Sequence, residues 1–276
     1  MTSAAIETMD VDQPPPRVRP WTGPRILGVV LVSFWIACGI GLAVYLVIAW
    51  NPELFWRYLP YYISGLGVTL SLVGLSVAIG AVLSIPIAYA RMSKNPVLGA
   101  LAYGYVYFFR GTPLLAQTFL IYYGLGSFRH ELEAVGLWTF FREAWNCAIF
   151  AFALNTAAYQ AEILRGALMS VSPGQWEAAQ ALGLSRYRIM RSVILPQALI
   201  VALRPYGNEI ILMIKGSAIV AIITVYDLMG ETRRAYSRTF DFQTYLWAAI
   251  IYLAIVEALR HVVDWIERRI TIHLQR

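Results

Sequence analysis

The chain has 276 residues and a formal net charge of +6; 59% of the residues are apolar and only 14% are charged. A soluble domain carries about a quarter charged residues, so this composition excludes an ordinary soluble protein and predicts an integral membrane protein. The positive charge is spread over the ends and loops between apolar segments. This distribution suits anionic lipid headgroups and speaks against a nucleic-acid-binding protein.

The amino-terminal region divides into a polar tail and an apolar helix. Residues 1–24 hold acidic and basic residues and three consecutive prolines, a composition typical of a disordered tail. The uncharged segment 26–50 is too long for the apolar part of a signal peptide and lacks a convincing cleavage site. We therefore predict a disordered cytoplasmic tail at 1–24, an extra membrane helix and loop at 25–57, and the main membrane domain at 58–276.

Further apolar segments predict an all-α protein with about six membrane crossings in total, because roughly 20 apolar residues cross a hydrocarbon core of about 30 Å. Besides 26–50, the segments are 58–90, 96–128, 145–169, 192–214 and 242–263. The distribution of lysine and arginine favours cytoplasmic amino and carboxyl termini by the positive-inside rule. Four basic residues oppose that rule because they fall in the last external segment: Lys215, Arg233, Arg234 and Arg238.

A polar segment at 172–197 interrupts the apolar pattern and predicts two short cytoplasmic helices. Pro173 suits the first position of a helix, and Gly183 stands where that helix would end in a left-handed turn. Ala178 and Ala181 share one helix face, on which a partner could approach closely. Three arginines that follow can steer a charged partner: Arg186, Arg188 and Arg191.

This segment resembles the EAA loop of bacterial ABC-importer permeases. The residues that carry the resemblance are Glu177, Ala178, Ala179, Gly183, Leu195 and Pro196. Val193 stands where the family usually has isoleucine. The resemblance implies an ABC type I importer transmembrane domain at 58–276, in which the segment 172–197 couples to a separate ATPase. An ordinary amphipathic hairpin between membrane helices is the alternative interpretation.

Other motifs resemble the polar amino-acid uptake branch of these permeases. They are Thr69-Leu70, Arg110-Gly111-Thr112-Pro113-Leu114, Glu162 with Arg165-Gly166, Gly174-Gln175 and Pro196-Gln197. Relatives in this branch commonly have five membrane helices, so 26–50 is an addition to the minimal pattern. The resemblance implies alternating access in the bacterial inner membrane, within a dimer of this permease and a copy of itself or a homologous chain. It also implies a periplasmic amino-acid-binding protein and a cytosolic ABC ATPase dimer as partners.

The absence of other motifs narrows the chemistry of the chain. No G-x-x-x-x-G-K-[ST] phosphate loop occurs, so we expect no cofactor here and assign ATP and Mg²⁺ to the partner ATPase. No H-E-x-x-H, G-x-S-x-G or paired-cysteine motif occurs either, which predicts no catalytic and no metal site. An ion-coupled secondary transporter remains a remote alternative, although it would not need a socket for an ATPase.

Charged residues within predicted crossings are candidates for the substrate pathway, because an ionised side chain there is paired or faces a polar cavity. Glu162 and Arg165 are three residues apart, which favours a structural ion pair over substrate contact. Arg110 precedes Gly111 and Pro113, which can break a helix. It either fixes a kink or lines the pathway.

Glu209 has no oppositely charged residue three or four positions away. Either another helix satisfies this carboxylate, or it faces a central cavity and balances a cationic substrate, with Asn208 as a hydrogen-bonding neighbour. The Asn-Glu pair resembles permeases for histidine, lysine, arginine and opines; permeases for glutamate or glutamine are the alternative. Much of the family continues Lys-Asp-Thr-Ser-Leu, whereas this chain has Lys215 followed by Gly216, so only Lys215 is carried over as a pathway residue.

Overall fold

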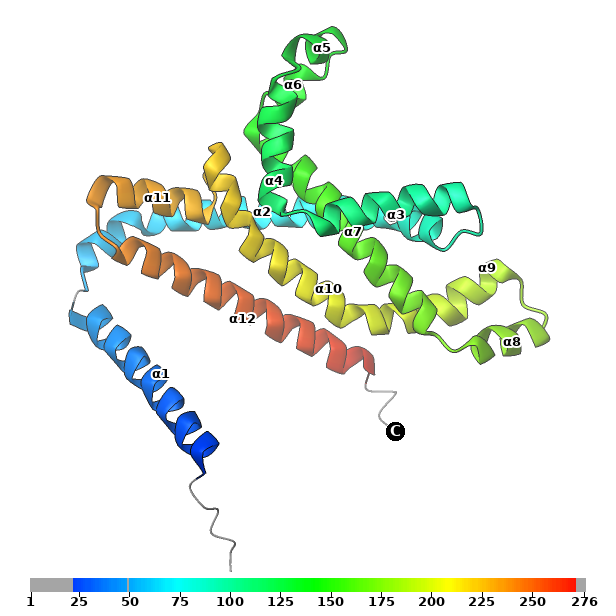
Figure 1. Ribbon diagram of the computed structural model, residues 1–276, viewed down its shortest axis with the longest axis horizontal. Coiled ribbons are helices and arrows are strands. Elements are labelled where there is room, and N and C mark those ends of the chain that lie inside the picture. The colour runs from blue at the N-terminus through cyan, green and yellow to red at the C-terminus, as the bar shows by residue number, and fades with distance from the viewer. Residues whose placement is uncertain (1–21, 49, 272–276) are drawn as a thin grey trace, which may run out of the picture. The chain divides into compact units, whose positions relative to one another are not determined.

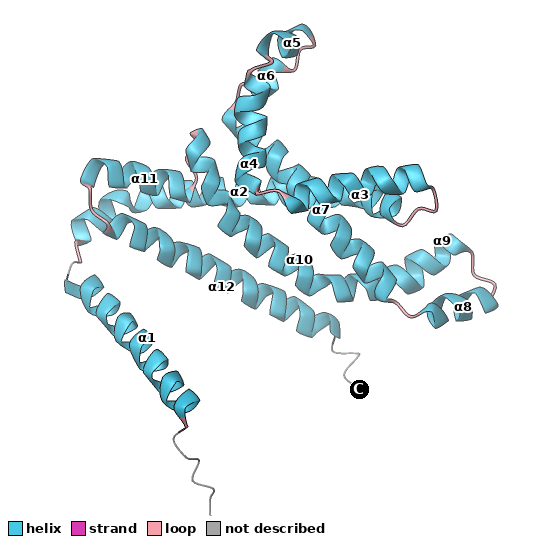
Figure 2. Ribbon diagram, viewed as in Figure 1, coloured by secondary structure: helices cyan, strands magenta, loops and turns pink. Residues whose placement is uncertain are grey.

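The computed structural model describes residues 22–48 and 50–271, and every regular element in these two ranges is a helix (Figures 1 and 2). The chain divides into two compact units, 1–51 and 52–276. The predicted tail at 1–24 lies outside the described residues except for its last three positions.

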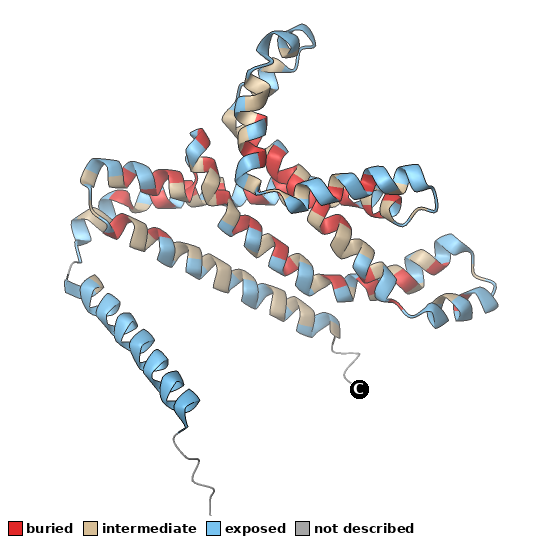
Figure 3. Cartoon of the chain, in the orientation of Figure 1, coloured by how far each residue is buried: buried red, intermediate tan, exposed pale blue. Residues whose placement is uncertain are grey.

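The first unit contains helix α1 (Gly23–Ile48), which has 26 residues and buries none of its described side chains (Figure 3). Its length and apolar composition are sufficient to cross a membrane. A helix with apolar residues on every face is suited to lipid rather than to water.

The second unit is a helical assembly built around α2 (Pro52–Arg91) and α7 (Ala144–Ser170). The remaining elements are, in chain order, α3 (Pro96–Gly111), α4 (Leu114–Phe119), the π-helical turn η1 (Leu120–Gly124), α5 (Arg129–Ala134), α6 (Trp138–Phe141), α8 (Pro173–Ala181), α9 (Arg186–Ile189), the π-helical turn η2 (Met190–Ile194), α10 (Leu195–Ser217), the 3-10 turn η3 (Ala218–Ile223), α11 (Leu228–Thr239) and α12 (Gln243–Thr271).

Five helical segments of the described residues are long and apolar enough to cross a membrane: Gly23–Ile48, Pro52–Arg91, Ala144–Ser170, Arg186–Ile223 and Gln243–Thr271. The predicted crossing at 192–214 begins earlier, because α9 and η2 run without a break into α10. The predicted crossing at 242–263 extends to Thr271.

The predicted crossing at 96–128 is not one continuous helix, because this segment forms two helices. Helix α3 ends at Gly111, Thr112 and Pro113 have extended backbones, and the chain continues as α4 and η1 in a different direction (Figure 1). Proline lacks an N–H group and disfavours a helical residue before it, so Pro113 ends α3 and starts α4.

The core is formed where small residues let α7 approach α2. Five alanines of α7 are fully buried: Ala148, Ala151, Ala157, Ala158 and Ala161. On α2, a Cβ atom added at Gly80 would lie 2.5 Å from Cγ2 of Thr156 and 2.9 Å from Nε2 of Gln160. Lipid tails are as apolar as leucine, so close packing of small residues is the main force that joins such helices.

Candidate functional site

The polar segment predicted to couple to a partner forms the short helix α8, which is separate from the membrane helices on either side of it in the chain. Pro173 occupies the first turn, and Gly183 follows the helix with φ of +73°, so the predicted helix start and left-handed turn are both confirmed. The side chain of Ser172 makes no capping hydrogen bond. The second predicted helix is not separate, because α9 continues through η2 into α10. Leu195 and Pro196 therefore lie in the first turn of α10, inside this continuous helix.

Helix α8 is fixed to the membrane helices by the buried side chain of Ala179 and the half-buried side chain of Trp176. Ala179 is only 5% exposed and belongs to an apolar cluster with Val171 at the end of α7 and with Ile189 and Ile194 near the start of the α9–α10 helix. Other parts of the segment are open to solvent: Glu177 and Ala178 on α8 are exposed, and Leu182, just after the helix, is 80% exposed. The predicted contact residues thus divide into an anchor, Ala179, and an accessible face, Glu177 and Ala178.

A groove of about 520 Å³ lies beside α8. It is lined by α8 and by the neighbouring ends of α2, α7 and the α9–α10 helix, through Met92, Leu168, Met169, Val171, Pro173, Trp176, Glu177, Gln180, Met190 and Ile194. Three methionines make its wall adaptable, because methionine is flexible and polarisable.

The predicted ion pair between Glu162 and Arg165 is present, with 2.8 Å between Oε2 and Nη2. A third residue, Arg91 at the end of α2, places its Nε atom 2.9 Å from Oε1 of the same carboxylate. The carboxylate of Glu162 is therefore neutralised by two arginines, and its contact with Arg91 also joins α2 to α7. This arrangement fits the structural interpretation of Glu162.

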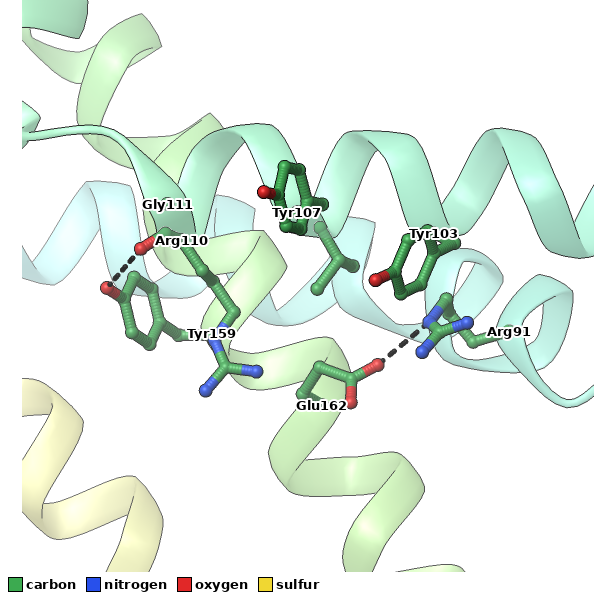
Figure 4. Close-up of a pocket in the computed structure, with 8 residues that line it drawn as sticks. Arg91, Tyr103, Tyr107, Arg110, Gly111, Tyr159 and Glu162 are labelled. Carbon is green, nitrogen blue, oxygen red and sulfur yellow. Dashed lines mark hydrogen bonds and ion pairs between the residues drawn. The ribbon is translucent and has the colours of Figure 1, made fainter.

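Arg110 lies in a cavity between α3 and α7, named here the Arg110 cavity (Figure 4). It has a volume of about 310 Å³ and is lined by Arg91, Tyr103, Val106, Tyr107, Arg110, Gly111, Tyr159 and Glu162. A second cavity of about 370 Å³ shares Arg110, Tyr159 and Glu162 and extends to α10. The Arg110 guanidinium lies 5.1 Å from the centroid of the Tyr159 ring. In the described part of the chain, no carboxylate lies within ion-pair distance of it.

Two buried amides hold the helix break that positions Arg110. Nε2 of Gln117 donates to the carbonyl oxygens of Phe109 (2.9 Å) and Thr112 (3.1 Å). Nδ2 of Asn155, on α7, donates to the same Phe109 oxygen (3.0 Å) and to Oε1 of Gln117 (2.9 Å). The carbonyl groups freed by Pro113 are thereby satisfied inside the protein, as a lipid environment requires.

Glu209 is only 5% exposed and accepts a 2.9 Å hydrogen bond from Oγ1 of Thr156. Nε2 of Gln160 donates to the same Thr156 oxygen (3.1 Å) and to the Val77 carbonyl on α2 (3.1 Å). A buried polar chain thus connects α2, α7 and α10.

The other two predicted pathway residues are not brought together with Glu209. Asn208 and Lys215 are exposed on α10, whereas Glu209 faces α7. Sequence reasoning also missed the partners Thr156, Gln160, Gln117 and Asn155. A usable signal was present, because three of these polar residues lie within one apolar segment, at 155, 156 and 160. Residues 156 and 160 are four positions apart, so they share one face of a helix.

Helix α11 was not predicted, and it carries three exposed arginines: Arg233, Arg234 and Arg238. Asp227 caps its first turn, because Oδ1 accepts from the Gly230 N–H at 2.8 Å. Burial raises the pKa of Asp227 to about 6. Thr224 and Phe240, on either side of the helix, have positive φ values of 66° and 51°, an uncommon conformation for such side chains.

A groove of about 560 Å³ runs beside this helix. Its lining includes Arg233, Arg234, Tyr226, Tyr236 and Tyr245. Arginine and tyrosine are enriched in protein interfaces, so this surface has the composition of a docking site. We name it the α11 surface, defined by Arg233, Arg234 and Arg238 with these three tyrosines.

Comparison with known proteins gives one consistent family. Residues 80–272 match the family described as "Binding-protein-dependent transport system inner membrane component". The nopaline transport system permease protein NocM of Agrobacterium fabrum is 46% identical over 210 residues, covering 75% of this chain and 87% of the relative. The arginine ABC transporter permease protein ArtM of Escherichia coli is 37% identical over 214 residues, covering 78% and 96%.

Solved structures agree with these relatives. An amino acid ABC transporter crystallised with histidines superposes with a TM-score of 0.72 at 37% identity, covering 80% of this chain and 99% of the other. The MetNI methionine ABC transporter, in an inward-facing conformation, gives a TM-score of 0.65 at 21% identity, which shows the fold alone. The chain is therefore a multi-pass membrane protein that belongs to the family of binding-protein-dependent transport system inner membrane components.

Proposed function

We propose that this chain is the permease subunit of an ABC importer that moves polar, cationic amino acids or opines from the periplasm to the cytoplasm. It works by alternating access beside a second permease in the bacterial inner membrane, with both termini in the cytoplasm. A separate ATPase dimer binds ATP and Mg²⁺ and supplies the energy. The chain itself is not an enzyme.

One observation carries the coupling part of this proposal: α8 is an exposed helix on a fixed base. Ala179 and the Gly183 turn hold it at the junction of α7 and the α9–α10 helix, while Glu177, Ala178 and Leu182 face outward. A push on α8 therefore reaches two membrane helices at once. A rigid lever of this kind is what conversion of ATPase closure into helix movement requires.

The cargo class is supported by the relatives and by one buried acid. The relatives above are nopaline and arginine permeases, and an octopine permease, OccM of Rhizobium meliloti, is 40% identical over 222 residues. Nopaline, octopine and arginine all carry a guanidinium group. We propose that Glu209 balances this positive charge when the helices part, with Asn208, Arg110 and Lys215 along the pathway.

The periplasmic partner is an amino-acid-binding protein that docks on the external side. The α11 surface supports this part of the proposal, because its three exposed arginines oppose the positive-inside rule. Arg234 lies 3.6 Å from Glu231, whereas Arg233 and Arg238 form no ion pair among the described residues. An acidic patch on the binding protein would complement them.

Co-purification tests the assignment. We expect an affinity-tagged form of this chain, expressed with the adjacent genes, to retain an ATPase that has a phosphate loop. Glu177→Lys should insert normally yet lose ATP-driven uptake. The control is Glu53→Lys, at an exposed position in the first turn of α2, which should insert and keep ATP-driven uptake. Uptake by vesicles that contain no ATPase would instead support an ion-coupled secondary transporter.

A ligand screen on the purified binding protein tests the cargo. Arginine, lysine, histidine, ornithine or an opine is the expected ligand. Glutamate or glutamine as the tightest ligand would overturn the cationic assignment and leave the importer class intact.

A further inference from the structure

We propose that Arg110 is a carboxylate-binding residue of the translocation pathway, so that the permease reads the anionic end of its cargo separately from the cationic end. This inference rests on the proposed importer function and gives Arg110 a defined role within it. Three features of the Arg110 cavity support it: its charge, the available donors of the guanidinium and the fixed backbone at Arg110.

The charge of the cavity favours an anion. Two arginines, Arg91 and Arg110, line it together with one carboxylate, that of Glu162. That carboxylate is already bound to Arg91 on one oxygen and to Arg165 on the other. An added anion would therefore meet an excess of positive charge, whereas an added cation would find no available acidic group among the described residues that line the cavity.

The Arg110 guanidinium keeps its donors available. One of its faces is covered by the Tyr159 ring, at 5.1 Å from the centroid, which leaves the N–H groups at its edge directed into the cavity (Figure 4). A planar guanidinium binds a carboxylate through two parallel hydrogen bonds, which a lysine ammonium cannot reproduce. Tyr103 and Tyr107 line the same cavity from α3 and can donate further hydrogen bonds to an anion.

The backbone at Arg110 is held in place before any ligand arrives. It is the penultimate residue of α3, and the carbonyl oxygens on both sides of it, those of Phe109 and Thr112, are held by the buried Gln117 amide. Asn155 fixes Gln117 in turn, from α7. A backbone held in this way presents the guanidinium from a fixed point, so less freedom is lost there when the ligand binds.

The two charges define an orientation for the cargo. Arg110 and Glu209 lie beside neighbouring residues of α7, because Asn155 binds the Phe109 carbonyl next to Arg110 and Thr156 binds the Glu209 carboxylate. A ligand with a guanidinium at one end and a carboxylate at the other can bind Glu209 and Arg110 together. A ligand that lacks the carboxylate can bind only Glu209, so the permease should bind it more weakly.

The test compares arginine with agmatine, which is arginine without its carboxylate, in direct binding to the purified importer complex in lipid nanodiscs without the binding protein. We expect the native complex to prefer arginine by at least tenfold. Arg110→Gln should lose that preference by weakening arginine at least tenfold and leaving agmatine unchanged. Arg110→Lys should restore only part of the preference, and Arg129→Gln, an exposed arginine of α5 in an ion pair with Glu133, should change neither ligand.

Several outcomes would overturn the inference. Equal weakening of arginine and agmatine in Arg110→Gln, together with a lower unfolding temperature, would mean that Arg110 only supports the helix break. If inorganic phosphate competed equally with arginine and with agmatine, the cavity would be a site for free inorganic anions and not for the carboxylate of the cargo. Unchanged arginine binding in Arg110→Gln would refute this inference but not the proposed function, whereas a native complex that binds neither ligand would refute the proposed cargo as well.

Discussion

The Thr156 hydroxyl donates a 2.9 Å hydrogen bond to the Glu209 carboxylate and so connects the buried acid of α10 to α7. The same hydroxyl oxygen accepts from Gln160, which also binds the Val77 carbonyl of α2. Three membrane helices thus share one polar chain. A charged group in this setting is kept only where it is paired or used, which makes Glu209 the first residue to test.

Glu209→Gln should reduce uptake of arginine, lysine and histidine roughly tenfold or more. The amide oxygen of glutamine still accepts from Thr156, so the fold should persist while the negative charge is lost. Thr156→Val should weaken uptake less, because it leaves the carboxylate charged but removes its hydrogen bond, a loss of about 1–3 kcal/mol. Thr156→Ser keeps the hydroxyl and serves as the control. Radiolabelled uptake in proteoliposomes measures all three; full activity of Glu209→Gln would remove this residue from the substrate site.

Gly80→Ala should destabilise the contact between α2 and α7. The added Cβ would lie 2.5 Å from Cγ2 of Thr156, so the two helices must separate or repack, at a cost of about 1–3 kcal/mol. The matched control is Gly74→Ala on the same helix, where a Cβ meets no atom within 4 Å. Thermal unfolding in detergent distinguishes the two. Equal unfolding temperatures for both variants would show that the α2–α7 contact adapts without cost.

Replacement of Gly183 should uncouple ATP hydrolysis from uptake. Its φ of +73° is left-handed, where a β-branched residue costs about 1–2 kcal/mol and asparagine costs less. We therefore expect Gly183→Val to impair uptake while membrane insertion and ATPase binding persist, and Gly183→Asn to keep most activity. The ratio of substrate moved to ATP hydrolysed is the measurement. An unchanged ratio in Gly183→Val would argue against α8 as a rigid lever.

The buried Asp227 should make stability depend on pH. Burial raises its pKa from 3.8 to about 6, so the folded protein holds the proton over a range in which the unfolded chain has released it. Stability is therefore highest below pH 4 for this group and falls as the pH rises towards 6. At 1.4 kcal/mol for each pKa unit, the loss is roughly 3 kcal/mol.

Asp227→Asn should remove this dependence. The amide oxygen can still cap α11 through the Gly230 N–H, but no charge is buried, so the variant should be the more stable protein at pH 7. Thermal unfolding between pH 4 and pH 8 tests this, with Asp264→Asn on α12 as the control. Parallel pH profiles for the native protein and Asp227→Asn would contradict the prediction.

Reversal of charge on the α11 surface should weaken docking of the binding protein. We expect Arg233→Glu combined with Arg238→Glu to raise the concentration of binding protein needed for half-maximal ATPase stimulation about tenfold at low salt. The effect should shrink at high salt, because exposed charges are screened. Arg260→Glu, on α12, is the control. Stimulation that is independent of both charge and salt would place the docking site elsewhere.

The sequence was sufficient for the features that depend on local residue type. Apolar length identified α1, α2, α7, α10 and α12, and the Gly111–Pro113 motif contained the break that divides 96–128. The Gly183 turn followed from the conformational freedom of glycine. These features are set within a few residues of chain, so a pattern in the sequence is enough to predict them.

Features that depend on distant partners were not accessible in this way. Thr156 and Glu209 are separated by 53 residues, and Arg91 and Glu162 by 71. Helix α11 was not predicted because its arginines and glutamate make it too polar to be recognised as a membrane crossing. Its contacts with α2 and α12, which are distant in the sequence, hold it in place. The burial of Ala179 and the exposure of Ala178 likewise depend on how α8 lies on its neighbours.

The helix that runs without interruption from Arg186 into α10 has a consequence for how this protein tolerates change. Ile189, packed beneath α8, and Glu209, packed against α7, are twenty residues apart on one continuous backbone. Deleting one residue between them would rotate one relative to the other by about 100°. Substitutions in the intervening stretch should therefore be accepted far more readily than insertions or deletions.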